Sequence, residues 1–227
     1  MRIFKILTVS ALTVLLAACG AGSSTVPQFS SLVSFGDSLS DAGTYKVGTV
    51  AALGGGKYTV NGPEGKNWID LMAARLGLPA PCAAETGLDG LASQGFSVPA
   101  TKKAGCTAYA QGGARVTNPV GPGNKLLGGG NAVLGQLTVP VITQMNNHLA
   151  AAGGAYKGNE MVFVLAGGND VFINLGAVGA GAATPTQAVT EMGKAGAELA
   201  GYIKAFVLGK GAQYVAVVNL PDVSKTP

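Results

Sequence analysis

Residues 161–170 read Met-Val-Phe-Val-Leu-Ala-Gly-Gly-Asn-Asp, an unbroken apolar run that leads directly into a pair of glycines. A short apolar run without alternation is typical of a strand that is covered on both faces, as in a parallel sheet. Gly167 and Gly168 then predict a tight turn at the carboxyl end of this strand. The stretch therefore indicates an α/β domain.

Two further apolar runs lie on either side of this stretch in the sequence. Residues 32–35 read Leu-Val-Ser-Phe and stop at Gly36, and residues 214–218 lead into the polar loop 219–222. Helical patterns separate these runs, over residues 67–76, 134–152 and 184–209. Alternating strands and helices predict a three-layer α/β/α sandwich with a central parallel sheet, formed by one domain over residues 32–227.

Two of the expected helices have clear start or stop signals. Thr184 and Gln187 match a capping box, with Pro185 at the first helical position, so we expect a helix that runs to Gly209. The helix over residues 67–76 ends before Gly77, and its apolar positions are Trp68, Leu71, Met72 and Leu76.

The expected helix over residues 134–152 has one apolar side. Val139, Ile142, Met145 and Leu149 share that side. This phase leaves Gln144, Asn147 and His148 nearer to solvent. We therefore expect His148 to be a surface residue.

The composition narrows the class of protein. The 227 residues include 36 glycines and only 11% charged residues, with a net charge of +4. The basic side chains are scattered and are not interleaved with aromatic residues, which disfavours binding to nucleic acid. One histidine and three cysteines are too few for a structural zinc site, and the glycine clusters do not match a phosphate-binding loop. We expect no metal and no cofactor.

The amino-terminal residues predict export. Residues 1–18 have the form of a secretory signal, with a basic start and an apolar run that is short for a membrane-spanning helix. A retained membrane anchor is the less favoured alternative. Residues 16–19 read Leu-Ala-Ala-Cys and resemble the lipobox of bacterial lipoproteins, which implies a lipidated Cys19, and Gly20 implies transfer to the outer membrane. We expect a lipid-anchored protein of the outer membrane or periplasm, with residues 19–31 as its linker.

An oxidising compartment would affect the other two cysteines. If Cys19 is lipidated, Cys82 and Cys106 remain and are candidates for a disulfide. The segment between them shows no sustained periodicity, so we expect a long loop that a covalent link would hold. The alternative is two separate buried thiols.

In an open parallel sheet, ligands bind beyond the carboxyl ends of the strands. Three polar motifs follow apolar segments and are therefore expected at that position. They are residues 36–41 (Gly-Asp-Ser-Leu-Ser-Asp), 112–114 (Gly-Gly-Ala) and 167–170 (Gly-Gly-Asn-Asp). Each motif alone has a structural alternative, since Gly-Asp-Ser after a strand also occurs as a simple capped turn.

Taken together and in this order, the motifs resemble those of the GDSL, or SGNH, hydrolase family of esterases and lipases. Residues 35–43 closely match the family's nucleophile motif, which maps Ser38 onto the nucleophile. Residues 109–114 map Gly113 onto the oxyanion-hole glycine, with Ala108 where the family often has asparagine. Residues 167–170 map Asn169 onto the side-chain oxyanion donor.

The resemblance covers about residues 32–222 and implies a flavodoxin-like fold and hydrolysis of small-molecule or lipid esters. Acyl transfer needs a nucleophile on a rigid turn and donors aimed at the developing oxyanion. Ser38 supplies a hydroxyl and an N–H, Gly113 a second N–H, and Asn169 a neutral amide. Asp37 and Asp170 are expected to support the turns, because neighbouring side chains point in different directions.

The family's general base comes from an Asp-x-x-His motif near the carboxyl terminus, and this sequence has no such motif. His148 has Met145 three residues before it and precedes Asn169, so it does not fit. We therefore expect an incomplete hydrolase domain, nearly inactive by itself, whose catalytic Asp and His lie beyond residue 227.

Two other functions remain open from the sequence. One is a lipoprotein that binds a glycan or acyl ligand in the same cleft without turnover, and the other is a structural surface lipoprotein. The presence of Gly113 and Asn169 together with Ser38 favours the enzyme, because simple binding does not need an oxyanion site. Short-chain esters, lysophospholipids and acetylated sugars are all compatible substrates.

Overall fold

The structure is a computed structural model that describes residues 27–223. The expected signal peptide and the lipidation site at Cys19 lie outside the described residues. Within residues 27–223, no helix is both long enough and apolar enough to cross a membrane.

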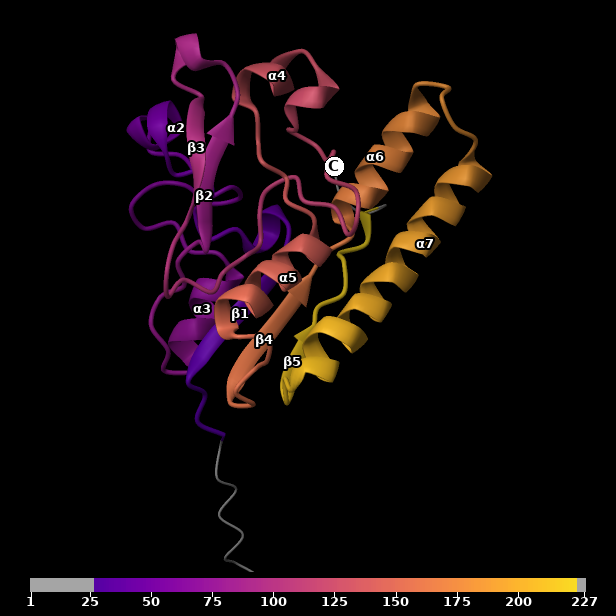
Figure 1. Cartoon of the computed structure of the whole chain (residues 1–227). Helices are drawn as coiled ribbons and strands as arrows, with labels where there is room; N and C mark the ends of the chain where they lie inside the picture. Colours follow the sequence, from indigo (N-terminus) through magenta and orange to yellow (C-terminus); the bar gives the residue numbers. More distant parts are fainter. Residues whose placement is uncertain (1–26, 224–227) are drawn as a thin grey trace, which may run out of the picture.

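A parallel sheet forms the centre of the molecule (Figure 1). Its strands are β1 (Ser31–Gly36), β4 (Glu160–Leu165) and β5 (Tyr214–Val217), in the order β1-β4-β5. Both pairs are parallel, and Gly36 pairs with Leu165 at the carboxyl ends of β1 and β4. All three strands predicted from the apolar runs are confirmed.

An extended segment continues the sheet on the free side of β1. The Ser34 N–H donates to Thr107 O (3.1 Å), the Tyr109 N–H to Ser34 O (2.8 Å) and the Gln111 N–H to Gly36 O (3.2 Å). Ala108 forms parallel bridges with Ser34 and with Ala83. The sequence analysis did not predict this pairing, which brings the residues before Gly112 beside the end of β1.

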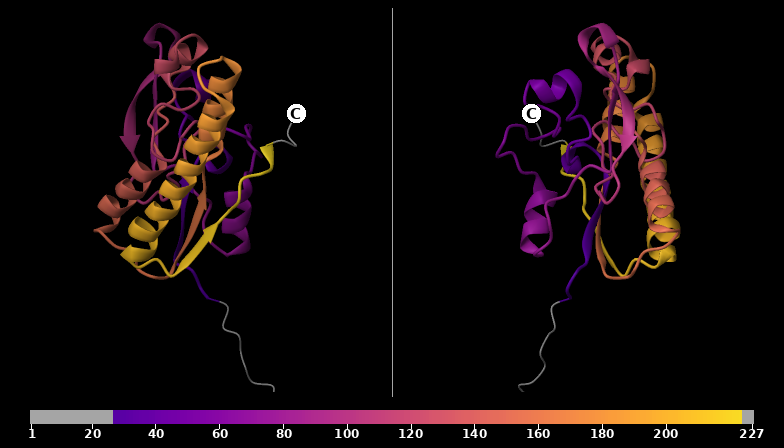
Figure 2. Two further views of the ribbon diagram at one scale, coloured as in Figure 1. Left: turned by 90° about the vertical axis from the view of Figure 1, so that its right-hand side faces the viewer. Right: turned by 60° about the vertical axis from the view of Figure 1, so that its left-hand side comes forward.

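Helices cover both faces of the sheet, which confirms the three-layer α/β/α sandwich (Figure 2). One face packs against α5 (Val141–Ala152) and the continuation of α7 (Pro185–Tyr202), and the other against α3 (Trp68–Arg75). Successive strand residues point to opposite faces, so Val33 packs towards α5 and Leu32 towards α3.

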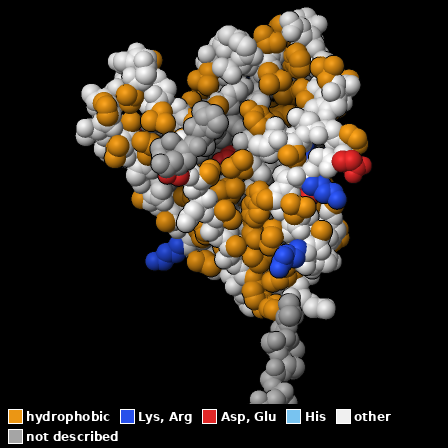
Figure 3. Space-filling model, turned by 180° about the vertical axis from the view of Figure 1, so that it is seen from behind, with side chains coloured by type: hydrophobic (Ala, Val, Ile, Leu, Met, Phe, Trp, Pro, Cys, Tyr) orange, Lys and Arg blue, Asp and Glu red, His pale blue; other side chains and the backbone are white. Residues whose placement is uncertain are grey.

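The two faces are covered unequally. Among the described residues, the hydrophobic cluster on the α5 and α7 side has twelve buried members, and the cluster on the α3 side has three. Figure 3 views the molecule from behind and shows hydrophobic side chains gathered at the surface of this side. The main core therefore lies between the sheet, α5 and the end of α7.

The capping box predicted for α7 is present, and α3 has one that was not predicted. Thr184 and Gln187 form the capping box of α7, with Pro185 at its start, and the helix continues through a π-helical turn (Ile203–Val207) and a 3-10 turn (Leu208–Lys210). Helix α3 has a second capping box, between Asn67 and Asp70. Its buried residues are Ile69 and Ala73, whereas Leu71, expected on the apolar side, is 58% exposed.

The prediction for α5 was wrong in its start and in its buried face. The helix begins at Val141, after Pro140, and its buried residues are Val141, Gln144, Met145, His148 and Leu149. Gln144 lies three residues after Val141, and His148 lies three residues after Met145, so they share the helix side that faces the core. His148 is 4% exposed and therefore not a surface residue. The Gln144 amide is satisfied there, because it accepts from Gly36 N (2.9 Å) and donates to Gly36 O and Val139 O (both 2.8 Å).

The segment between Cys82 and Cys106 is not the long loop that we expected. It contains an antiparallel hairpin of β2 (Glu85–Asp89) and β3 (Ser97–Lys102). Most of β3 is exposed, so it lacks the apolar alternation that reveals a strand in a sequence. Three short or glycine-rich helices were also not predicted: α2 (Gly48–Ala52), α4 (Gly130–Leu134) and α6 (Gly168–Gly179).

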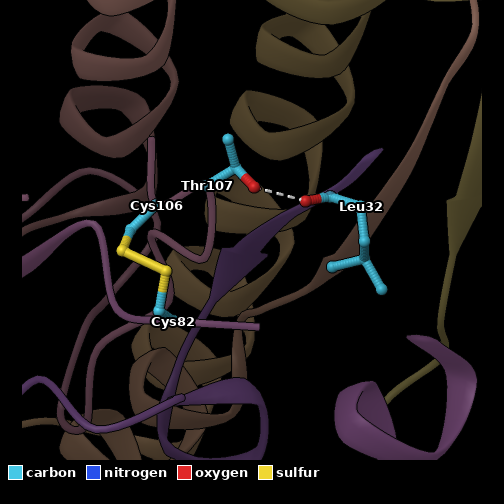
Figure 4. The surroundings of a disulfide bond; sticks show 4 residues. All are labelled: Leu32, Cys82, Cys106 and Thr107. Atoms are coloured by element: carbon cyan, nitrogen blue, oxygen red, sulfur yellow. Dashed lines mark hydrogen bonds between the residues drawn. A yellow bond between two sulfur atoms is a disulfide. The ribbon is translucent and has the colours of Figure 1, made fainter. Parts of the chain in front are cut away.

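A disulfide joins Cys82 to Cys106 at the base of the hairpin (Figure 4). Next to it, the Thr107 hydroxyl donates to Leu32 O in β1 (2.6 Å). The Ala108 N–H donates to Cys82 O (3.3 Å). The disulfide therefore holds the start of the segment that pairs with β1.

Candidate active site

The three polar motifs lie at one edge of the sheet. β1 and β4 end side by side at Gly36 and Leu165, so the Ser38 turn and the start of α6 leave the sheet as neighbours. A Cβ atom on Gly36 would lie 1.9 Å from Leu165 O, so only glycine allows this close approach. A Cβ on Gly168 would lie 3.6 Å from Asp37 Oδ2, which places the two loops in contact.

Ser38 is the first residue of a 3-10 turn (Ser38–Ser40) that follows β1. Asp37 caps this turn, and its carboxylate accepts from the Leu39 N–H (3.1 Å). Ser38 is partly exposed, and no residue in the described part of the chain forms a hydrogen bond with its hydroxyl. The hydroxyl is therefore available to a substrate.

Asp41 links the Ser38 turn to the second motif, a role that the sequence analysis did not assign. Its carboxylate accepts from Gly43 N (2.8 Å), Thr44 N (2.7 Å) and Gly112 N (2.8 Å). Burial raises the pKa of Asp41 to about 6, although the three N–H groups act in the opposite direction. One side chain therefore sets the position of Gly112 relative to the Ser38 turn.

Gly113 has a backbone conformation and surroundings that exclude a side chain. Its φ is +76°, and a Cβ atom would lie 2.0 Å from Pro122 O and 2.7 Å from Thr138 Cγ2. Within residues 27–223, the Gly113 N–H donates to no acceptor. This N–H remains available as a donor.

The third motif forms a hydrogen bond with the second. Asn169 is buried near the start of α6, and its Nδ2 donates to Ala114 O (2.8 Å). An amide nitrogen has two hydrogens, so one remains for a ligand. Asp170 accepts from Arg115 Nε and from Val116 N (both 2.9 Å). The structure thus joins the loops of Ser38, Gly113 and Asn169 through Asp41, Asn169 and Asp170.

A comparison with protein families agrees with this arrangement. The model of the family described as GDSL-like Lipase/Acylhydrolase matches residues 32–227. The chain belongs to the GDSL-like lipase/acylhydrolase family. A search of curated proteins found no match. Family membership supports ester hydrolysis as the general activity of this protein.

The carboxyl groups next to the family motifs support the turns. Burial raises the pKa of Asp37 to about 6, and the charge of Asp170 adds to this effect. Arg115 balances the charge of Asp170 through their ion pair. No group of three or more His, Cys, Asp or Glu residues in the described chain is arranged to hold a metal ion.

His148 is packed inside this GDSL-like domain, on the α5 side of the sheet, and within residues 27–223 it forms no hydrogen bond with the Ser38 turn. Its ring contacts those of Phe35, Tyr109 and Tyr156, with ring centroids 4.7–5.8 Å apart. It lines a cavity of about 620 Å³ that also reaches Ser31 and Glu160, at the amino ends of β1 and β4. Burial lowers its pKa, and the charge of Glu160 opposes this shift. His148 is thus part of the core between the sheet and α5.

Proposed function

We propose that this domain hydrolyses carboxylic esters through an acyl-enzyme on Ser38. The observation that carries the proposal is that hydrogen bonds hold three loops together where the Ser38 hydroxyl is free. Asp41 binds Gly112, and Asn169 binds Ala114. The Gly113 N–H and one Asn169 amide hydrogen have no acceptor in residues 27–223. Together with the Ser38 N–H, they form the proposed oxyanion hole.

The proposed reaction has two acyl-transfer steps. The Ser38 oxygen attacks the ester carbonyl carbon while a general base accepts the hydroxyl proton, and the three donors bind the oxygen that becomes negative. The base then protonates the alcohol as the C–O bond to it breaks, which leaves an acyl-serine. Water attacks this ester in the same way and releases the carboxylic acid.

The general base of this reaction is not supplied by His148. Its ring contacts three aromatic rings and lines the cavity at the amino ends of β1 and β4, and neither ring nitrogen forms a hydrogen bond within residues 27–223. The family resemblance implies that an Asp-x-x-His segment supplies the base and its orienting acid, and the 227 residues contain no such segment. The present chain is then nearly inactive.

The decisive experiment compares the 227-residue chain with a version extended by its downstream coding sequence, both shown to be folded. The substrate is 4-nitrophenyl acetate, and the variants are Ser38→Ala and the control Ser97→Ala on the exposed strand β3. Loss of a triad member costs about four to six orders of magnitude, so Ser38→Ala and the unextended chain should both lack turnover. Activity that survives Ser38→Ala would contradict the acyl-enzyme, and equal turnover of the two lengths would contradict a downstream base.

A binding protein without turnover is the second candidate function. It is supported by the absence of a base next to the Ser38 hydroxyl in residues 27–223. The two functions differ in their response to extension of the chain. A stop codon directly after Pro227, together with calorimetric binding of an acyl or glycan ligand that is recovered unchanged, would favour the binding protein.

A further inference from the structure

Tyr45 is buried, and its hydroxyl forms hydrogen bonds with two backbone groups. It is 3% exposed, and its hydroxyl donates to Gly112 O (2.7 Å) and accepts from Thr138 N (3.3 Å). Its ring also lies against the same loop, because a Cβ atom on Gly112 would come within 2.9 Å of Tyr45 Cε2. The tyrosine therefore holds one particular peptide group.

That peptide group carries the Gly113 N–H. The Gly112 carbonyl and the Gly113 N–H belong to the same peptide bond, and the described chain contains no cis peptide. In a trans peptide these two groups point in opposite directions. Because Tyr45 holds the carbonyl on its own side, the Gly113 N–H points away from Tyr45, and it has no acceptor in residues 27–223.

This peptide group needs a hydrogen bond to fix its orientation because it joins two glycines. Glycine loses more conformational freedom than any other residue when it is fixed, and a peptide between two glycines rotates with little steric resistance. Side chains are nevertheless excluded at both positions, at Gly112 by the rings of Tyr45 and Tyr58 and at Gly113 by Pro122 O. Asp41 fixes the Gly112 N–H, and Tyr45 fixes the next peptide along the chain.

We propose that Tyr45 is a positioning residue that orients and polarises the Gly113 N–H towards the oxyanion. This inference rests on the proposed function of Gly113. A hydrogen bond to an amide carbonyl strengthens the N–H of the same amide as a donor, by about 10–30% per bond. The Tyr45 hydroxyl thus acts on the oxyanion through the peptide, without touching the substrate.

The surroundings of Tyr45 keep its hydroxyl a donor. Burial and the nearby charge of Asp41 raise the pKa of Tyr45 well above its usual value of 10. The phenol is therefore neutral at every pH at which esterases are assayed. The Tyr45 hydroxyl therefore keeps its proton and donates to Gly112 O throughout the reaction.

The test compares Tyr45→Phe with the matched control Tyr58→Phe. The Tyr58 ring contacts the Tyr45 ring, with centroids 6.2 Å apart, but Tyr58 is 41% exposed and its hydroxyl binds no described residue. The first measurement is the amide nitrogen and proton shift of Gly113 by NMR in the folded chain. We expect Tyr45→Phe to move the Gly113 signal upfield or split it, and Tyr58→Phe to leave it in place.

The second measurement is kinetic and uses the version of the protein that hydrolyses esters. Tyr45→Phe should lower kcat about tenfold or more, less than the 100- to 1000-fold expected when a donor is lost outright. KM should stay within about twofold, because the oxyanion interaction is made mainly in the transition state. A merely structural role would not separate kcat from KM in this way.

Tyr45→Phe leaves two buried backbone groups without a hydrogen-bond partner, which destabilises the fold. A second variant that keeps both hydrogen bonds is therefore tested as well. Incorporation of 3-fluorotyrosine at position 45 keeps the ring and the hydroxyl and makes the hydroxyl a stronger donor. It should move the Gly113 signal in the direction opposite to that of Tyr45→Phe.

An unchanged Gly113 signal in folded Tyr45→Phe, or in the fluorotyrosine protein, would overturn the proposal. Activity that depends on Ser38 but shows an unchanged kcat in Tyr45→Phe would overturn the role of Tyr45 and leave the proposed function intact. If no version of the protein hydrolyses esters, the proposed function fails, and the Gly113 signal still decides whether Tyr45 orients this peptide.

Discussion

Asn169 uses one amide hydrogen to hold the neighbouring loop, through Ala114 O, and keeps the other for a ligand. At the scale of single residues, Asn169→Ala should therefore remove an oxyanion donor and lower kcat about 100-fold or more. Steady-state kinetics on the ester-hydrolysing protein would measure this loss. Asn146→Ala, on the exposed side of α5, is the matched control and should have wild-type kinetics. Similar losses in both variants would argue against an oxyanion role.

His148 should make the stability of the domain depend on pH. Its pKa is lowered in the fold by burial, so below the unfolded value of about 6.5 the unfolded chain binds a proton that the folded chain does not. Stability from this residue is complete above pH 6.5 and is lost as the pH falls, with the unfolding constant rising at most about tenfold per pH unit.

The His148 ring contacts three aromatic rings, and the cavity that it lines also includes the charged residues Glu85, Lys102, Lys103, Lys157 and Glu160. His148→Phe keeps a flat ring at this position. Urea unfolding at pH 7.5 and 5.5 would measure the effect as the difference between wild type and His148→Phe. The difference is needed because Asp37 and Asp41, with pKa values raised to about 6, add stability as the pH falls through 6. An equal pH response of the two proteins would contradict a neutral buried His148.

At the scale of elements, α7 depends on its amino-terminal cap. The Gln187 N–H donates to the Thr184 hydroxyl (3.2 Å), and the Thr184 N–H donates to Gln187 Oε1 (2.8 Å). Thr184→Ala should lower the free energy of unfolding by about 1 kcal/mol, because it leaves a helix N–H without its partner. Thr190→Ala, further along the exposed side of the helix, is the control and should be neutral or slightly stabilising. Chemical denaturation would show the contrast.

The hairpin β2–β3 depends on the Cys82–Cys106 disulfide, which closes a loop with a sequence separation of 24. A loop of this length is worth roughly 3 to 4 kcal/mol in the chain-entropy model. Replacing both cysteines by serine should lower the free energy of unfolding by about this amount and loosen the pairing of residues 107–111 with β1. Hydrogen exchange at Tyr109 and Gln111, compared with exchange in β4, would test the second effect. Free thiols at both positions in the protein purified under oxidising conditions would contradict the pairing.

At the scale of the whole molecule, the chain enters β1 at the edge of the sheet opposite to Ser38 (Figure 1). A lipid anchor at Cys19, which we propose from the lipobox resemblance, would be attached at that end and would leave the Ser38 edge open to substrate. Mass spectrometry of the protein expressed in a bacterial host should show an acylated amino terminus at Cys19. Cys19→Ser should release the protein from the membrane fraction, and an unmodified terminus elsewhere would rule out the anchor.

The layers of the fold could be predicted from the sequence, and so could the residues proposed for the candidate site. The apolar runs of β1, β4 and β5 could be read because strands covered on both faces need nearly continuous apolar residues. The cap of α7 could be read because capping depends on neighbouring residues. Ser38, Gly113 and Asn169 could be proposed because each lies in a short motif that resembles a family pattern.

Contacts between groups far apart in the sequence became visible in the folded molecule alone. The buried side of α5 depends on contacts with other segments, such as the Gly36 N–H and carbonyl, which both form hydrogen bonds with Gln144. Residues 107–111 pair with β1, which lies far from them in the sequence. The Tyr45 hydroxyl donates to Gly112 O across a sequence separation of 67. A sequence encodes local propensity and periodicity directly, whereas hydrogen bonds to the backbone of a distant segment have no residue signature there and form only when the chain packs.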